Sequence, residues 1–128
     1  MTRVLVIDDD KSIGNAIEAL LCRQGCVTVA ADNRRLAAET FEASDFDVVM
    51  VDIFMPEMDG IETMRCLRGR APTVPIIAMS GFRFANSTAP APDFLGMAAK
   101  LGATCCLRKP FEPRQLMAAI GACLGDIA

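Results

Sequence analysis

The sequence predicts an α/β protein in which a five-stranded parallel sheet is covered by helices on both faces. Short apolar runs alternate along the chain with longer segments of helical periodicity. Hydrophobic residues make up 52% of the 128 residues, which suits a sheet that is buried on both sides. Alternating strands and helices require right-handed crossovers, so we expect a doubly wound (βα)5 arrangement.

Five short apolar runs predict the strands. Each is rich in β-branched or other apolar residues and is followed by polar or turn-forming residues. The expected strands are residues 4–7, 27–30, 48–51, 75–79 and 105–107.

Apolar residues that recur every three or four positions predict amphipathic helices between these strands. Glu112 before Pro113 predicts the start of the last helix, because proline is favoured at the first helical position. Asp93 and Gly102 bracket a shorter, fourth helix. The other apolar stripes are Ile13, Ile17, Leu20 and Leu21; Leu36, Ala37 and Phe41; Ile61, Met64 and Leu67; and Leu116, Ala119, Ile120 and Cys123.

Length and charge narrow the classes of protein. Residues 1–128 are expected to form a single domain. No apolar run approaches the ~20 residues of a membrane-spanning helix, and acids arrive too early for a signal peptide, so we expect a cytoplasmic protein without membrane insertion. The net charge is −3, and the small basic cluster of Arg65, Arg68 and Arg70 predicts a solvated helix face and no direct nucleic-acid binding.

The chain has six cysteines and no histidine. No two cysteines form a CxxC pair, which disfavours a structural zinc site. Most cysteines have apolar neighbours, which predicts small core residues in a reducing compartment. The absence of histidine excludes every mechanism that needs a histidine base or ligand from this chain.

Polar residues follow four of the five predicted strands, and sites in open parallel sheets form at this carboxyl edge. Asp8–Asp10 follow the first strand, Asp52 the third, Ser80 the fourth and Lys109 the fifth. Neighbouring carboxylates repel each other unless a cation lies among them, and oxygen ligands suit Mg²⁺. A carboxylate beside a metal is a competent nucleophile toward phosphorus, and an amine and a hydroxyl suit the phosphoryl oxygens. Each residue also has an ordinary explanation, as a helix cap, a turn or a solvated charge.

Four segments carry a resemblance to a known family: VLVIDDDKS, VVMVDIFMPEMDGIE, PIIAMSG and LRKPFEPRQL. In order and spacing they resemble the receiver domain of two-component response regulators, from Arg3 to about Leu124. The resemblance implies a flavodoxin/CheY-like fold with strand order 2-1-3-4-5. It also implies a binding module, not an enzyme, that accepts a phosphoryl group from a sensor histidine kinase or a histidine phosphotransfer protein.

The same resemblance assigns roles at the metal site. Asp52 would be the phosphoacceptor and a Mg²⁺ ligand. Asp9 would bind the ion directly and Asp8 through water, and the backbone carbonyl of Phe54 would complete the protein's ligands.

The resemblance further implies how the switch works. Ser80 would hydrogen-bond the phosphoryl group, and Lys109, with a cis bond to Pro110, would form an ion pair with it. An unknown downstream protein would then bind near residues 80–110, through the face of the fourth helix, fifth strand and fifth helix. The sequence departs from the family in three places: Cys106 replaces the usual aromatic residue, residues 82–92 form an unusually long loop, and Phe54 and Gly81 flank the phosphoryl group with opposing effects on its lifetime.

Two other functions remain open. A receiver-like scaffold that works without phosphorylation would explain Cys106. A haloacid-dehalogenase-like phosphatase would use Asp8 as nucleophile and Asp10 as acid/base, but it leaves the M-P-x-M-D-G run unexplained.

Overall fold

The computed structural model describes residues 2–43, 46–53, 60–80, 99–100 and 102–125. Within these ranges five parallel strands form one sheet in the order β2-β1-β3-β4-β5, which confirms the predicted class and strand order. The strands are β1 (Arg3–Ile7), β2 (Val27–Ala31), β3 (Val48–Asp52), β4 (Ile76–Ser80) and β5 (Cys105–Arg108). The helices are α1 (Lys11–Arg23), α2 (Arg34–Ala43), α3 (Gly60–Arg70) and α5 (Pro113–Cys123).

Some features expected from the sequence fall on other parts of the chain. The loop of residues 82–92 lies outside the described residues, and so does almost all of the helix expected between Asp93 and Gly102. No described helix is long and apolar enough to cross a membrane.

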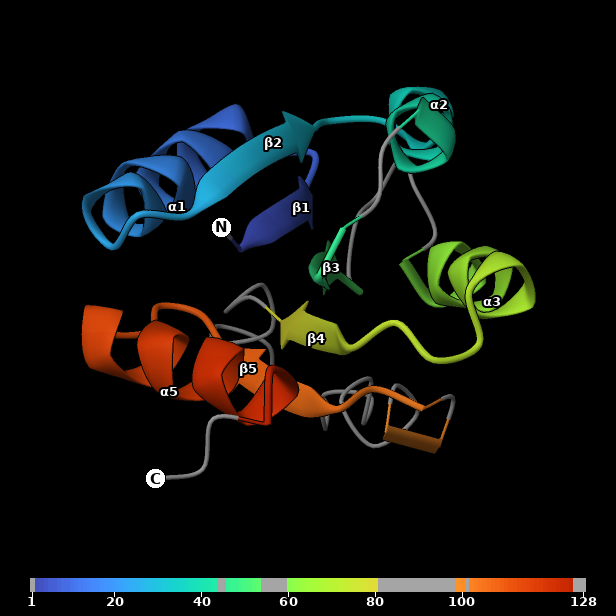
Figure 1. The fold of residues 1–128 in the computed structure, drawn as a ribbon. Coiled ribbons are helices and arrows are strands. Elements are labelled where there is room, and N and C mark those ends of the chain that lie inside the picture. The colour runs from blue at the N-terminus through green and yellow to red at the C-terminus, as the bar shows by residue number, and fades with distance from the viewer. Residues whose placement is uncertain (1, 44–45, 54–59, 81–98, 101, 126–128) are drawn as a thin grey trace, which may run out of the picture.

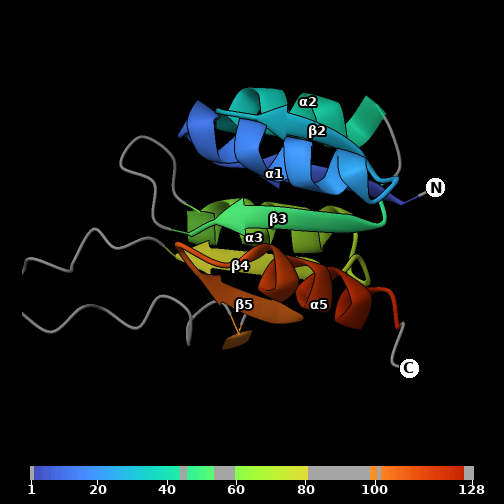
Figure 2. The same cartoon turned by 90° about the vertical axis from the view of Figure 1, so that its left-hand side faces the viewer.

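The sheet divides the core into two layers (Figure 1). Leu5 and Ile7 of β1 pack with α2 and α3, whereas Val4 and Val6 pack with α1 and α5. Successive side chains of a strand point to opposite faces, so a strand covered on both faces is mostly apolar. All five residues of β3 are buried, and the first four are apolar, whereas the last is Asp52. Figure 2 shows the strands running in one direction, which brings their carboxyl ends to one edge of the sheet.

Side chains near the first turns of the helices explain where these helices begin. The Asp10 carboxylate accepts hydrogen bonds from the Ser12 backbone N–H at 2.9 Å and from its hydroxyl at 2.6 Å, and so caps α1. At α5, Glu112 is the N-cap and Pro113 the first helical residue, as predicted. The Glu112 N–H donates to the side chain of Gln115 at 2.7 Å.

The prediction that most cysteines are core residues is wrong. Three of them are exposed and three are half-buried. An apolar neighbour in a helical sequence does not place a residue on the buried face, because successive residues are rotated by about 100° around the helix axis. The exposed ones are Cys22, Cys66 and Cys106, and the half-buried ones are Cys26, Cys105 and Cys123.

The prediction of a solvated arginine face is wrong for Arg68, which is half-buried. Its guanidinium donates to the backbone carbonyls of Ala71, Pro72, Val74 and Gly102, the last at 2.6 Å. Gly102 has a φ of +97°, and a Cβ at this position would lie 3.1 Å from Arg68 Nε. A glycine therefore suits both the backbone and the arginine at this position.

Candidate functional site

Three carboxylates meet at the carboxyl edge of the sheet. Asp52 ends β3 and Asp8 follows β1; the two strands are neighbours, with Ile7 in register with Val51. Asp52 is only 1% exposed and Asp8 only 3%. One carboxylate oxygen from each of Asp8, Asp9 and Asp52 lies within 4.8 Å of the others. The structure thus brings together the predicted acidic pair and the predicted acceptor.

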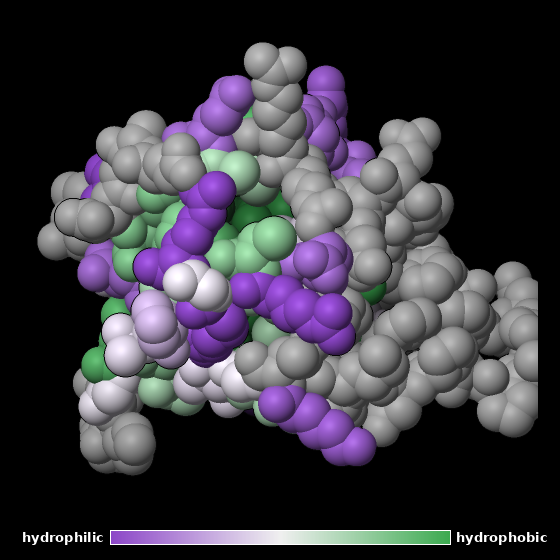
Figure 3. Space-filling view, turned by 90° about the vertical axis from the view of Figure 1, so that its right-hand side faces the viewer, coloured by the Kyte–Doolittle hydropathy of each residue, from purple (hydrophilic) through white to green (hydrophobic). Residues whose placement is uncertain are grey.

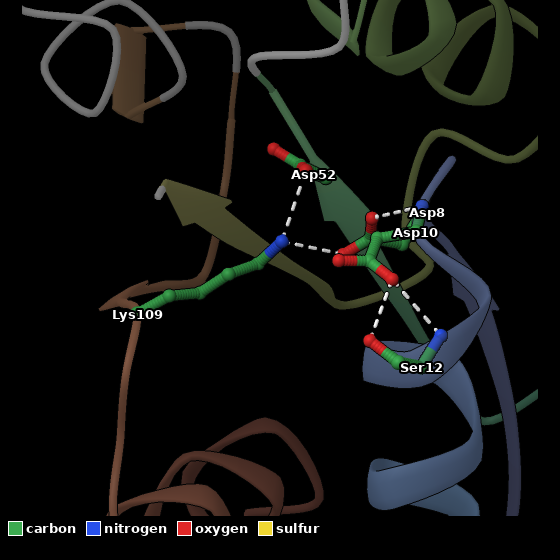
Figure 4. Close-up of polar contacts among 5 residues, drawn as sticks. All are labelled: Asp8, Asp10, Ser12, Asp52 and Lys109. Carbon is green, nitrogen blue, oxygen red and sulfur yellow. Dashed lines mark hydrogen bonds and ion pairs between the residues drawn. The ribbon is translucent and has the colours of Figure 1, made fainter. Parts of the chain in front are cut away.

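Lys109 directly follows β5, and its side chain extends toward these acids (Figure 4). Its Nζ lies 2.5 Å from Asp8 Oδ2 and 2.9 Å from Asp52 Oδ2, and its side chain is 12% exposed. Its backbone N–H donates to the Ser80 carbonyl at 2.7 Å, which continues the β4–β5 pairing by one residue. The bond from Lys109 to Pro110 is cis, as predicted.

The pKa of Lys109 is set by two opposing effects. Burial alone would lower it, because desolvation disfavours the charged form. The hydrogen bonds and charges of Asp8 and Asp52 outweigh burial, so the pKa of Lys109 lies above its ordinary value. The ammonium form is therefore the one that bridges the two acids.

The donor set fits a hard divalent cation. The cluster holds three carboxylates, and the ammonium of Lys109 pairs with two of them, Asp8 and Asp52, so acidic groups outnumber the cation. Oxygen donors at this density suit Mg²⁺, which is usually held by one or two carboxylates together with waters. Phe54, whose carbonyl was predicted as a further ligand, lies outside the described residues.

Asp10 does not share this role, although it follows directly in the sequence. Its carboxylate turns toward Ser12, and hydrogen bonds from the Ser12 hydroxyl and backbone lower the pKa of Asp10. Its backbone N–H donates to Asp8 Oδ1 at 2.9 Å, which fixes the orientation of the Asp8 carboxylate. The explanation as a helix cap therefore holds for Asp10, and its side chain is unsuited to the acid/base role of a phosphatase.

Ser80 lies on β4 and Cys106 on β5, the two strands that follow β3 in the order of the sheet. Ser80 is the last residue of β4, and the preceding Met79 is in register with Asp52, so Ser80 lies at the same edge as the acids. Cys106 lies on β5 in register with Ala78 and is exposed. One feature had no signal in the sequence: Lys109 bridges Asp8 as closely as it does Asp52.

The chain matches the response regulator receiver domain family over residues 4–121. It is 33% identical over 125 residues to the sensory transduction protein RegX3 of Mycolicibacterium smegmatis, covering 97% of this chain and 51% of that protein. It is also 33% identical over 127 residues to the transcriptional regulatory protein CpxR homolog of Haemophilus influenzae, covering 97% and 51%. This chain thus spans about half the length of these two relatives.

Solved structures show the same architecture. The chemotaxis protein CheY4 of Vibrio cholerae is 29% identical with a TM-score of 0.80, and the match covers 94% of this chain and 96% of that one. A response regulator receiver domain protein of Clostridium thermocellum is 26% identical with a TM-score of 0.83, covering 98% and 96%.

Proposed function

We propose, from the premise that this chain belongs to the receiver domain family of two-component response regulators, that Asp52 accepts a phosphoryl group from a phosphohistidine. The donor would be a sensor histidine kinase or a histidine phosphotransfer protein, because this chain has no histidine. One observation carries the proposal: the buried Asp52 lies beside two other acids and 2.9 Å from an ammonium group. In this role residues 1–128 act as one phosphoacceptor domain in the cytoplasm, and not as an enzyme.

The transfer is a single displacement at phosphorus. A carboxylate oxygen of Asp52 attacks the phosphorus, and the bond from phosphorus to the donor's imidazole nitrogen breaks. The bonding electrons stay on that nitrogen, and an acyl phosphate forms on Asp52. Lys109 then pairs with the phosphoryl oxygens, to which the Ser80 hydroxyl donates a hydrogen bond.

The acids beside Asp52 have a different task. Asp9 would bind Mg²⁺ directly and Asp8 through water, with Asp52 and the Phe54 carbonyl as the other protein ligands. When bound, the ion supplies positive charge that offsets the repulsion between the acids and the incoming phosphoryl group. Asp10 holds the start of α1, and thereby the position of Asp8, through the backbone hydrogen bond at 2.9 Å.

The output follows from a change in the contacts of Lys109. Before phosphorylation its ammonium is shared by Asp8 and Asp52. A phosphoryl group adds charge near Asp52 and draws the ammonium toward it, which biases the packing of β5 and its neighbours. A downstream protein that binds near residues 80–110, on the face of β5, α5 and the helix expected between Asp93 and Gly102, would respond to this change. Because Cys106 stands where the family usually has an aromatic residue, the switch either works without the usual hydroxyl-to-aromatic relay or uses another side chain for it.

The intact mass of the protein after incubation with Mg²⁺ and acetyl phosphate tests this function. We expect the wild type to gain one phosphoryl group and Asp52→Asn to gain none. Asp10→Asn is the matched control, since it removes a nearby carboxylate but keeps a good helix cap, and it should still be phosphorylated.

Other outcomes would identify the competing functions. Phosphorylation that persists in Asp52→Asn but is lost in Asp8→Asn would indicate a phosphatase-like nucleophile. A wild-type protein that gains no phosphoryl group from acetyl phosphate or from a phosphorylated histidine kinase would be a receiver-like scaffold.

A further inference from the structure

Two half-buried thiols meet where α5 packs against β5. Cys105 is the first residue of β5 and Cys123 is the last residue of α5. Both side chains pack against the core layer that also includes α1. Figures 1 and 2 show α5 lying along β5 on this face of the sheet, and Figure 3 shows the opposite side of the molecule, with α2 and α3.

The geometry of α5 directs the Cys123 side chain toward Cys105. The thiol of Cys105 donates to the backbone carbonyl of Ala119 at 3.9 Å, and Cys123 lies one turn after Ala119. Side chains of an α-helix tilt toward its amino end, so the side chain of Cys123 leans back over the turn that Cys105 contacts. A side-chain hydrogen bond between the two thiols, which contributes to the raised pKa of Cys123, agrees with this placement.

The neighbouring thiol of Cys106 does not share this position. Successive side chains of a strand point to opposite faces, and Leu107 packs in the same core layer as Cys105. The side chain of Cys106 therefore points away from α5. Among the cysteines of β5, only Cys105 faces Cys123.

We propose that Cys105 and Cys123 form a reversible disulfide when the protein reacts with a low-molecular-weight disulfide such as oxidised glutathione. Such bonds in a reducing compartment are transient responses to oxidation. The cross-link would join the start of β5 to the end of α5, the two elements on either side of Lys109. It does not depend on phosphorylation of Asp52, because it is measured on the unphosphorylated protein.

The reaction is a pair of thiol–disulfide exchanges. The Cys105 thiolate attacks one sulfur of oxidised glutathione, the glutathione S–S bond breaks, and one glutathione thiolate leaves. Cys123 loses its proton and attacks the Cys105 sulfur of this mixed disulfide, and the second glutathione leaves. The two protein thiols are oxidised, one glutathione disulfide is reduced to two thiols, and the two protons pass to these thiols through water.

The order of the two steps follows from the chemistry of the thiols. The thiolate is the attacking form, and the raised pKa of Cys123 disfavours its thiolate, so Cys105 reacts first. The charge of Cys105 is one cause of that raised pKa. The mixed disulfide removes this charge, which favours the second step.

The intact mass after incubation with oxidised glutathione tests the proposal. The reaction is stopped with acid, and the remaining thiols are blocked with N-ethylmaleimide in denaturant. A disulfide within the chain removes two hydrogens and leaves four of the six cysteines to carry glutathione or maleimide. We expect this species in the wild type, and we expect dithiothreitol to restore all six thiols.

Variants and peptide mapping assign the cross-link to its two cysteines. Trypsin leaves Cys105 and Cys106 in one peptide and Cys123 in another, and these two peptides should be linked. Cys105→Ala and Cys123→Ala should each abolish the cross-linked species. Cys106→Ala is the matched control, since it removes the adjacent, exposed thiol, and it should form the cross-link like the wild type.

The proposal is overturned if the wild type gains only glutathione on single thiols, or if its only disulfide joins two molecules and doubles the mass. It is also overturned if the cross-link persists in Cys123→Ala or is lost in Cys106→Ala. Should the variants at the half-buried positions not fold, the linked peptides of the wild type and of Cys106→Ala decide, because Cys106 is exposed.

Discussion

Lys109 and Arg68 hold opposite ends of the same two strands, and they do so with different partners. Lys109 lies beyond the carboxyl ends of β4 and β5 and contacts the carboxylates of Asp8 and Asp52. Arg68 contacts backbone carbonyls just before each strand begins, at Val74 and at Gly102. The first cation has charged partners and the second has neutral ones.

Because of this difference, the contacts of Lys109 can be exchanged for others, whereas those of Arg68 cannot. Carboxylates can exchange an ammonium for a metal ion or a phosphoryl group, because all of these interactions are electrostatic. Backbone carbonyls have no such alternative partner. If Arg68 is removed, a carbonyl that stays buried has no hydrogen-bond donor, which lowers the free energy of unfolding. We therefore expect Arg68 to stabilise the amino ends of β4 and β5, and Lys109 to take part in the chemistry at their carboxyl ends.

The largest effect is expected for Lys109→Met in the absence of divalent cations. Removing the ammonium leaves two buried carboxylates without their counter-charge, which should lower the free energy of unfolding by about 3–5 kcal/mol. Urea denaturation measures this change. Lys11→Met is the control: Lys11 forms an exposed ion pair with Asp32 at 3.4 Å, and its loss should cost at most ~1 kcal/mol. Equal effects of the two variants would contradict the difference between buried and exposed cations.

Arg68→Ala should lower the free energy of unfolding by about 2–4 kcal/mol, because hydrogen bonds from a charged group are worth ~1.5–3 kcal/mol each and are not additive. The same denaturation experiment applies. Arg65→Ala, one turn earlier on α3 with an exposed partner in Glu62, should change stability by ~0.5 kcal/mol or less. A loss as small as that of Arg65→Ala would show that Arg68 is dispensable.

Mg²⁺ should raise the free energy of unfolding through its contacts with the acids, and this gain should not depend on Arg68. At a concentration about 100-fold above its Kd, the gain is about 2.7 kcal/mol, since the ion binds the folded state alone. We expect Arg68→Ala to show the same gain as the wild type and Asp9→Asn to show much less, measured by thermal unfolding at constant ionic strength. A gain that Asp9→Asn retains in full would place the ion elsewhere.

The smallest effect concerns the half-buried thiol of Cys123, which packs near Cys105 on the same edge as Arg68. Burial, together with Cys105, raises the pKa of Cys123 from 9.0 to about 12. Above pH 9.0 the unfolded chain loses this proton while the folded chain keeps it, so the contribution to stability is complete below pH 9.0 and is lost as pH rises toward about 12.

Alkylation with iodoacetamide near the lower end of this range, followed by mass spectrometry, checks the prediction. Cys123 should react more slowly than Cys22, Cys66 and Cys106, which are exposed. In urea all four should react alike. Rapid labelling of Cys123 in the folded protein would be incompatible with a raised pKa.

Much of the fold could be predicted because the strands are buried on both faces. Residues 48–51 of β3 are all apolar for this reason, which makes the strand visible in the sequence. The gathering of Asp8, Asp52 and Lys109 was predictable for a related reason, since parallel strands bring their carboxyl ends to one edge.

The choice of partners could not be predicted. Arg68, Arg65 and Arg70 lie close together in sequence, yet Arg68 donates to backbone carbonyls of two separate chain segments, at Val74 and at Gly102, the second of which is 34 residues from the arginine. Such a contact depends on how α3 is rotated against the start of β5. The helical cysteines Cys22 and Cys66 were misplaced because the rotation of a helix, and not the apolarity of sequence neighbours, decides which side chains are buried.

The ion pair between Lys109 and Asp8 joins residues 101 positions apart in a chain of 128 residues. Contacts of such high sequence separation form late in folding, because a long loop must close first. During synthesis Asp8, Asp9 and Asp52 leave the ribosome well before their lysine does. The charge cluster is therefore completed only when β5 joins the sheet, and until then the three acids lack the cation that pairs with two of them in the folded protein.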